Sequence, residues 1–236
     1  APHNEPVLGY APGSTERKVL QTEYDRRMKT VIDAPMWIGG KAVETKDQRR
    51  MNPPHNHKHK LGMSHHGDAK HVRAAIDAAL KSKRDWEHMP WQERAAIYLK
   101  AADLISGPYR ASINAASMLA QSKNCFQAEI DSACEFADFL RFNVAYMTQI
   151  YRDQPGSAAG MWNRLEYRPL EGFVFALTPF NFTSIAGNLP SAPALMGNTV
   201  VWKPASTQIY SAQVIMEVFR LAGMPDGVIN LIHVDG

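Results

Sequence analysis

The fold of this chain is decided by residues 172–206, GFVFALTPFNFTSIAGNLPSAPALMGNTVVWKPAS. Residues 173–177 form an apolar run too short for an ordinary helix and bounded by a glycine and a proline, so they predict a strand buried on both faces. Residues 199–202 predict a second strand of the same kind. Residues 183–196 between them have the length and composition of a crossover helix, which two internal prolines are expected to kink or interrupt.

The same pattern continues to the end of the chain. Residues 208–222 predict a helix that Gly223 ends, because glycine adopts the left-handed conformation that closes many helices. Residues 228–234 predict a third strand. Residues 172–236 therefore predict β-α-β-α-β, the start of a Rossmann-like, doubly wound parallel sheet in an α/β protein. Such a sheet rarely stops directly after a strand, so we expect the chain to be part of something longer.

Upstream of the sheet, the sequence predicts an extended arm and several helices. Residues 1–14 are rich in Pro, Gly and Asn, and a charged helix is expected over residues 15–30. Gly39-Gly40, between two short apolar runs, predicts a hairpin. Asp68 is positioned to cap the first of four helices that continue to about residue 150.

The composition excludes several classes of protein. Hydrophobic residues make up 45% of the 236, which is ample for a packed core. A formal charge of +3, from 26 basic and 23 acidic residues, is nearly balanced and argues against a nucleic-acid partner. No apolar run reaches the roughly 18 residues that a membrane-spanning helix needs, so no membrane segment is expected. Two cysteines imply no disulfide framework and, by default, a reducing compartment.

Five histidines gather between residues 55 and 66. His55, His57 and His59 alternate and would share one face of a strand, with His65 and His66 nearby. A metal site is one interpretation, but no carboxylate or cysteine completes a ligand set at ordinary spacing. A solvated strand edge is the other interpretation, and we expect no metal.

Three carboxylates in the last of the four helices have helical spacing. Asp131, Glu135 and Asp138 lie at i, i+4 and i+7 and would share a face. The stripe is either solvated or offers a carboxylate to the ammonium group of a substrate.

Function is expected where the parallel strands end, because the ligands of open sheets bind beyond the carboxyl ends of the strands. The first strand leads into residues 178–182, TPFNF, and no glycine-rich turn follows it. Asn181 is either a turn former or an oxyanion donor, since an amide can direct an N–H at developing negative charge without transferring a proton. Lys203 either caps the second strand at the surface or binds ribose hydroxyls or a phosphate.

These segments resemble the aldehyde dehydrogenase superfamily. The similarity rests on residues 178–182 (TPFNF), 198–204 (NTVVWKP) and 222–230 (AGMPDGVIN), which occur in matching order and spacing. It is closer still to the members that oxidise L-glutamate γ-semialdehyde, through the segments NEPVL, FQAEID, DFLRFN and LEGFV, which begin at residues 4, 126, 138 and 170. The resemblance therefore spans nearly the whole chain.

The resemblance implies NAD-dependent oxidation of a small-molecule substrate, L-glutamate γ-semialdehyde, to L-glutamate in proline catabolism. Asn181 matches the family's oxyanion-stabilising asparagine, and Phe182 matches an aromatic residue near the aldehyde. Glu135 aligns with the acidic residue associated with the substrate's ammonium group. The cofactor-binding residues implied in the same way are Thr178, Lys203, Pro204, Ser206 and Gly236, of which Lys203 matches the lysine that binds the adenosine ribose.

The sequence also departs from the family pattern. Ser206 stands where many relatives have a glutamate that bonds the ribose, and a shorter neutral side chain repels a 2′-phosphate less. NAD is therefore favoured over NADP by the resemblance alone. The family's nucleophilic cysteine and general-base glutamate match positions beyond residue 236, so these 236 residues by themselves are expected to be inactive. Cys125 and Cys134 precede the sheet on helices without a nearby histidine, and we expect ordinary packing for both.

The sequence and the resemblance together predict four parts. These are an N-terminal arm, helix and hairpin (1–66), the helical part of the cofactor domain (67–150), a protruding hairpin or oligomerisation segment (151–171) and the start of the NAD-binding sheet (172–236). A homodimer or higher homo-oligomer in the mitochondrial matrix is implied. The alternatives are an aldehyde dehydrogenase of broader specificity and a non-catalytic binding or assembly partner.

Overall fold

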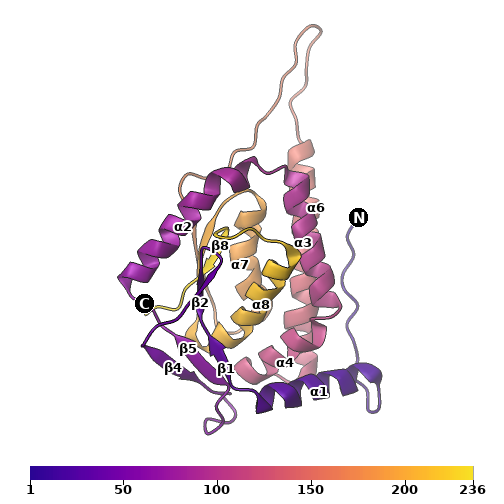
Figure 1. Cartoon of the computed structure of the whole chain (residues 1–236). Helices are drawn as coiled ribbons and strands as arrows, with labels where there is room; N and C mark the ends of the chain where they lie inside the picture. The colour runs from indigo at the N-terminus through magenta and orange to yellow at the C-terminus, as the bar shows by residue number, and fades with distance from the viewer. Residues whose placement is uncertain (236) are drawn as a thin grey trace.

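A five-stranded sheet in the order β3-β2-β8-β7-β6 lies at the centre of the structure, a computed structural model that describes residues 1–235 (Figure 1). β6, β7 and β8 are parallel, whereas β2 is antiparallel to both β3 and β8. The predicted parallel unit and the predicted hairpin are confirmed. Gly236, one of the expected cofactor-binding residues, lies outside the described residues. The strand bounds are β2 Met36–Ile38, β3 Lys41–Val43, β6 Val174–Thr178, β7 Val200–Pro204 and β8 Ile229–Leu231.

Helices cover both faces of the sheet, so the predicted doubly wound α/β arrangement is confirmed (Figure 1). α7 and α8 lie on the face where Val200 and Trp202 join the main core, and α3, α4 and α6 pack outside them. α2, capped by Asp68 as predicted, lies on the other face in a core that includes Val201. The bounds are α2 Ala69–His88, α3 Trp91–Ser106, α4 Arg110–Gln121, α6 Glu135–Arg152, α7 Thr183–Leu195 and α8 Ile209–Ala222.

β6 is the edge strand, and one of its faces is exposed. Ala176 and Thr178 are buried, whereas Phe175 is 55% and Leu177 is 58% exposed. Side chains alternate between the two faces of a strand, so these two residues share one face. The prediction that this strand is buried on both faces is wrong, because within the described residues α2 packs over β7 and β8 and leaves the neighbouring edge strand exposed.

α7 continues through Pro190 and Pro193, so of the two predicted effects the interruption is wrong and the kink stays a prediction. A proline inside a helix removes a backbone donor, and the last carbonyl groups of any helix need partners from outside it. Buried side chains supply those partners, which explains how packing holds the end of α7. Tyr98 donates to the carbonyl of Ser191 (2.6 Å), Trp86 to that of Ala194 (2.8 Å) and Arg94 to that of Leu195 (3.0 Å).

The long helix expected over residues 126–150 is divided. α5 (Cys125–Ala128) leads into a π-helix, η1 (Glu129–Cys134), and α6 follows. The turns of a π-helix are wider than those of an α-helix, so α-helical spacing does not hold across this segment. Glu129 is fully buried here and accepts hydrogen bonds from the backbone N–H of Leu8 (2.9 Å) and the hydroxyl of Tyr10 (2.7 Å). These bonds fasten the N-terminal arm to η1.

A second sheet has three strands in the order β1-β5-β4, and the predicted charged helix α1 precedes it. Residues 52–60 between β4 and β5 form turns, so the expected strand edge carrying the histidines is wrong. Pro53 and Pro54 have no backbone N–H to donate to a strand ladder, which accounts for the difference. The bounds are α1 Thr15–Lys29, β1 Ile32–Ala34, β4 Gln48–Met51 and β5 Gly62–His65.

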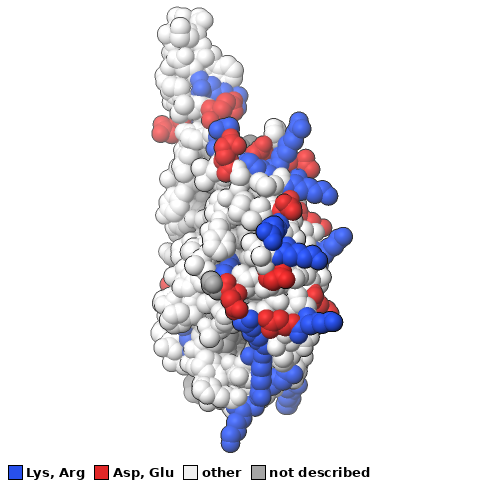
Figure 2. Space-filling model, turned by 90° about the vertical axis from the view of Figure 1, so that its left-hand side faces the viewer, with Lys and Arg blue, Asp and Glu red and all other residues white. Residues whose placement is uncertain are grey.

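Residues 153–173 contain no helix or strand and extend away from the rest of the molecule as two limbs (Figure 1). Met161 is 60% and Trp162 is 78% exposed in this segment. Figure 2 shows acidic and basic side chains intermingled along one side of the molecule and a largely uncharged tip on the protrusion. Among the described residues, no helix is both long and apolar enough to cross a membrane.

Candidate functional site

The carboxyl ends of β6 and β7 lie side by side. Leu177 is the register partner of Lys203, and Thr178 is the partner of Pro204. The buried hydroxyl of Thr178 accepts a 2.9 Å hydrogen bond from the indole nitrogen of Trp202, which ties the two strand ends together. The turn after β6 and the last residues of β7 therefore emerge at the same edge of the sheet.

Asn181 lies in the turn that connects β6 to α7, and it is exposed. Its carbonyl oxygen accepts a 2.6 Å hydrogen bond from Nζ of Lys123. Among the described residues no hydrogen bond engages its side-chain amide, so that amide is available to a ligand. Phe182 follows as the N-cap of α7, and its ring centroid lies 4.4 Å from the same Lys123 Nζ.

Glu135 faces the start of α7 across the π-helix boundary. The hydroxyl of Ser184 lies 2.9 Å from Oε2 of Glu135 and 3.1 Å from Oδ1 of Asp131, so two carboxylates share one hydroxyl. Asp131 is 3% exposed, which makes the solvated-stripe interpretation wrong for this residue. Asp138 is turned to the N-terminal arm, where it accepts a 2.7 Å bond from the side chain of Asn4. The three carboxylates therefore do not act as one stripe, because Asp131 lies within the wider turns of η1 and Asp138 faces the N-terminal arm.

Lys203 is half-buried at the end of β7, and among the described residues it forms no ion pair. As the register partner of Leu177 it shares the exposed face of β6. Burial lowers the pKa of the nearby His233 imidazole to about 4, and the charge of Lys203 contributes to the decrease. His233 is consequently neutral at physiological pH, so it adds no positive charge beside Lys203.

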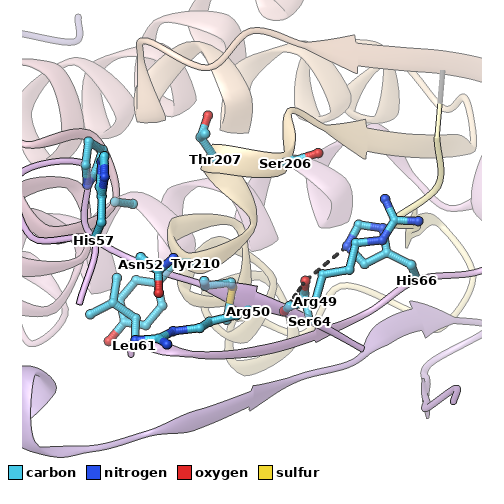
Figure 3. A pocket seen from close by; sticks show the side chains of 13 residues that line it. Arg49, Arg50, Asn52, His57, Leu61, Ser64, His66, Ser206, Thr207 and Tyr210 are labelled. Carbon is cyan, nitrogen blue, oxygen red and sulfur yellow. Dashed lines mark hydrogen bonds between the residues drawn. The ribbon is translucent and has the colours of Figure 1, made fainter. Parts of the chain in front are cut away.

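Ser206 lines a pocket of about 460 Å³ between the start of α8 and the smaller sheet (Figure 3). Figure 3 shows Ser206 and Thr207 on one side of this pocket and Arg50 and Tyr210 on another. Of the expected site residues that the structure describes, Ser206 alone lines it. Ser206 and Asn181 therefore do not line a common pocket. The turn that carries Asn181 lies at another place along the same edge of the sheet.

The alternating histidines and Cys134 do not form the metal site or the reactive thiol that their residue types could offer. Among the described residues, the group that could hold an ion is Asp33, Glu44 and His65, and none of the histidines between residues 55 and 59 belongs to it. His65 already bonds Asp33 at 2.8 Å. Cys134 is buried, and burial raises the pKa of its thiol to about 12, so it does not form a thiolate near neutral pH.

Sequence reasoning missed Lys123. It lies in the turn between α4 and α5, outside any periodic pattern, and its contacts are with residues more than 50 positions away or on another helix. Its one available signal is its place directly before Asn124, which caps α5.

Comparisons with known proteins support the family that the strand ends suggested. The sequence pattern of the Aldehyde dehydrogenase family matches residues 37–236. The chain is 51% identical over 231 residues to delta-1-pyrroline-5-carboxylate dehydrogenase from Agaricus bisporus, covering 97% of this chain and 42% of that protein. It is 45% identical over 236 residues to the mitochondrial protein of that name from Dictyostelium discoideum, covering 100% of this chain and 42% of that protein.

A solved structure gives the same result. The crystal structure of the Mycobacterium tuberculosis delta-pyrroline-5-carboxylate dehydrogenase bound with NAD matches with a TM-score of 0.98 and 52% identity, covering all of this chain and 44% of that one. The chain thus spans less than half the length of the relatives it matches.

Proposed function

The chain belongs to the aldehyde dehydrogenase family, and from that membership we propose that the protein containing it oxidises L-glutamate γ-semialdehyde to L-glutamate with NAD. The observation that carries the proposal is identity of about half along the whole chain to two proteins that bear the corresponding name. The coarser conclusion, an enzyme acting on a small aldehyde, rests on the family itself.

The residues at the strand ends fit a dinucleotide. Lys203 is a half-buried cation without an acidic partner among the described residues, and exposed Phe175 and Leu177 lie on the same face. A cation beside an apolar surface suits an adenosine, with the base on the apolar side chains and the ribose hydroxyls at the ammonium group. Thr178, Pro204 and Ser206 are proposed as further cofactor contacts. When bound, NAD supplies the acceptor for hydride.

Asn181 is proposed to stabilise the oxyanion that forms when a nucleophile adds to the aldehyde. Its side-chain amide is exposed and unengaged among the described residues, and it lies at the edge where the cofactor is proposed to bind. A fixed amide donor stabilises developing negative charge because it needs little reorganisation at the moment of reaction. Phe182, on the same turn, is proposed to contact the carbon chain of the substrate.

Glu135 is proposed to bind the ammonium group of the substrate. A charged hydrogen bond between a carboxylate and an ammonium group is stronger than a neutral one, so it can distinguish an amino-acid aldehyde from an unbranched aldehyde. Ser184 holds Glu135 at 2.9 Å.

The test is NADH formation by the full-length protein. Glutamate semialdehyde should be oxidised with a kcat/KM at least roughly tenfold above that for unbranched aldehydes of the same length, the discrimination expected of one charged contact. Equal rates would favour a broader-specificity aldehyde dehydrogenase. No turnover of any aldehyde would contradict the proposal and favour a non-catalytic role.

The protrusion is proposed to join copies of the protein into a homodimer or higher homo-oligomer. Its exposed side chains Met161, Trp162, Leu165 and Leu170 form an apolar surface that water would otherwise contact. Light scattering on the full-length protein and a Trp162→Asp variant tests this, since the variant should dissociate.

Because several relatives carry "mitochondrial" in their names, the mitochondrial matrix is proposed as the location. Subcellular fractionation checks it.

A further inference from the structure

Lys123 holds the turn that carries Asn181. Its Nζ donates to the carbonyl oxygen of Asn181 at 2.6 Å and to Oδ2 of Asp131 at 2.5 Å, and it lies 4.4 Å from the ring centroid of Phe182. One ammonium group thus contacts the two residues that follow Phe180 in the turn and a carboxylate from another segment. We infer that Lys123 is a positioning residue that fixes the direction of the Asn181 amide, an inference that rests on the proposed function.

Asp131 fixes Lys123 in turn. Asp131 is 3% exposed, and besides Lys123 it accepts from the backbone N–H of Thr183 at 3.3 Å and the hydroxyl of Ser184 at 3.1 Å. A carboxylate at the first turn of a helix is stabilised by the unpaired N–H groups there. Asp131 therefore joins the start of α7 to the Lys123 ammonium, and the side chain of Lys123 loses the freedom that an exposed lysine keeps.

The start of α7 is anchored separately by neutral groups. The Thr183 hydroxyl lies 2.6 Å from the hydroxyl of Ser117, and it accepts from Gln121 at 2.8 Å and from Gln208 at 3.0 Å. β6 is anchored at the other end of the turn by the bond from Trp202 to Thr178. Residues 179–182, between these two anchored ends, keep the most backbone freedom. The hydrogen bond from Lys123 to the carbonyl of Asn181 restricts that freedom.

This restriction matters for an oxyanion donor. The amide of Asn181 is exposed, and no hydrogen bond among the described residues orients it, so its direction follows from the backbone of the turn. An oxyanion donor must reach within about 2.7–3.1 Å of the reacting oxygen. A displacement of about 1 Å can cost roughly 100-fold in rate. Loss of Lys123 should therefore lower kcat and leave cofactor binding at Lys203 unchanged.

A double-mutant cycle in the full-length protein tests the inference. Lys123→Met should lower kcat for the semialdehyde roughly 10- to 100-fold with little change in KM for either substrate. In the Asn181→Ala background the same substitution should have almost no effect, because the group it positions is gone. Lys123→Arg should restore part of the rate. Lys100→Met, which alters an exposed lysine of α3 without a side-chain hydrogen bond or ion pair among the described residues, should match wild type.

Two results would overturn the inference. The first is a kcat of Lys123→Met equal to that of wild type; if the KM for the semialdehyde rises at the same time, Lys123 is a substrate-binding residue. The second is an equal loss of kcat in the wild-type and Asn181→Ala backgrounds. Hydrogen–deuterium exchange at residues 180–184 provides a readout independent of activity, and it should be faster in Lys123→Met than in wild type. If wild type oxidises no semialdehyde, the proposed function fails while the exchange rates still decide whether Lys123 orders the turn. If Lys123→Met does not fold, Lys123→Gln, whose neutral amide can still donate a hydrogen bond, takes its place in the cycle.

Discussion

The indole nitrogen of Trp202 donates a 2.9 Å hydrogen bond to the hydroxyl of Thr178, and both residues are buried. This bond joins β6 to β7 at their carboxyl ends, directly before the turn that carries Asn181. A buried donor left without an acceptor costs about 1–3 kcal/mol. This bond therefore adds to the backbone pairing of β6 with β7 in setting the relative position of the two proposed binding elements.

Thr178→Val should destabilise the protein by about 1–3 kcal/mol, since valine has nearly the shape of threonine but offers no acceptor to Trp202. Denaturant unfolding measures the change. Thr178→Ser keeps the hydroxyl and is the control, which should lose clearly less. No loss of stability in Thr178→Val, together with a clear loss in Thr178→Ser, would show that packing of the methyl group, and not the hydrogen bond, is what counts.

Lys203→Ala should weaken NAD binding by roughly tenfold, equivalent to about 1.4 kcal/mol, because it removes the cation at the end of β7. Calorimetric titration of the full-length protein with NAD measures Kd. Lys81→Ala, which removes an exposed lysine of α2, is the matched control and should bind like wild type. A Lys203→Ala isotherm identical to that of wild type would exclude Lys203 from the cofactor site.

Glu135→Gln should lower kcat/KM for glutamate semialdehyde by roughly 10- to 100-fold, as a neutral amide replaces a charged acceptor for the ammonium group. Rates with unbranched aldehydes should stay near those of wild type, because these substrates carry no ammonium group. Steady-state kinetics with both substrates checks the difference, and Glu93→Gln on the exposed side of α3 is the control. A loss of the same size for both substrates would mean that Glu135 supports the structure of the turn and does not select the substrate.

Stability should fall as the pH drops from about 6.5 to about 4. Burial lowers the pKa of His233 from 6.5 to about 4. Between these values the unfolded chain binds a proton that the folded chain excludes, so protonation favours unfolding. The full effect is on the order of 3 kcal/mol below both values and vanishes above about pH 7. His66 adds to it in the same direction, because burial lowers its pKa as well.

The measurement is the free energy of unfolding at about pH 7 and about pH 5. His233→Asn removes the titrating group and should lose less stability over this interval than wild type does. His88→Asn, at an exposed position, should behave like wild type. A pH dependence unchanged by His233→Asn would assign the loss to other groups.

The sequence predicted the parallel unit because the two apolar runs are short and clearly bounded, which leaves a helix little room. It did not predict the exposed face of β6. Phe175 and Leu177 are apolar, and an apolar run reads the same whether or not a helix covers that face of the strand. The separation of Asp131 from Asp138 also escaped it, since spacing counts assume α-helical turns and η1 has wider ones. Lys123 was not predicted because it contacts Asn181 and Phe182, which are distant from it in the sequence, and a single sequence carries no record of such contacts.

The proposed mechanism depends most on the amide of Asn181. Turnover of glutamate semialdehyde and affinity for NAD, measured on the same full-length Asn181→Ala preparation, test it directly, with Asn56→Ala at an exposed loop position as the control. We expect a kcat lowered by roughly 100-fold or more and an unchanged Kd for NAD, because the amide acts on the oxyanion and not on the cofactor. A kcat equal to that of wild type would contradict it.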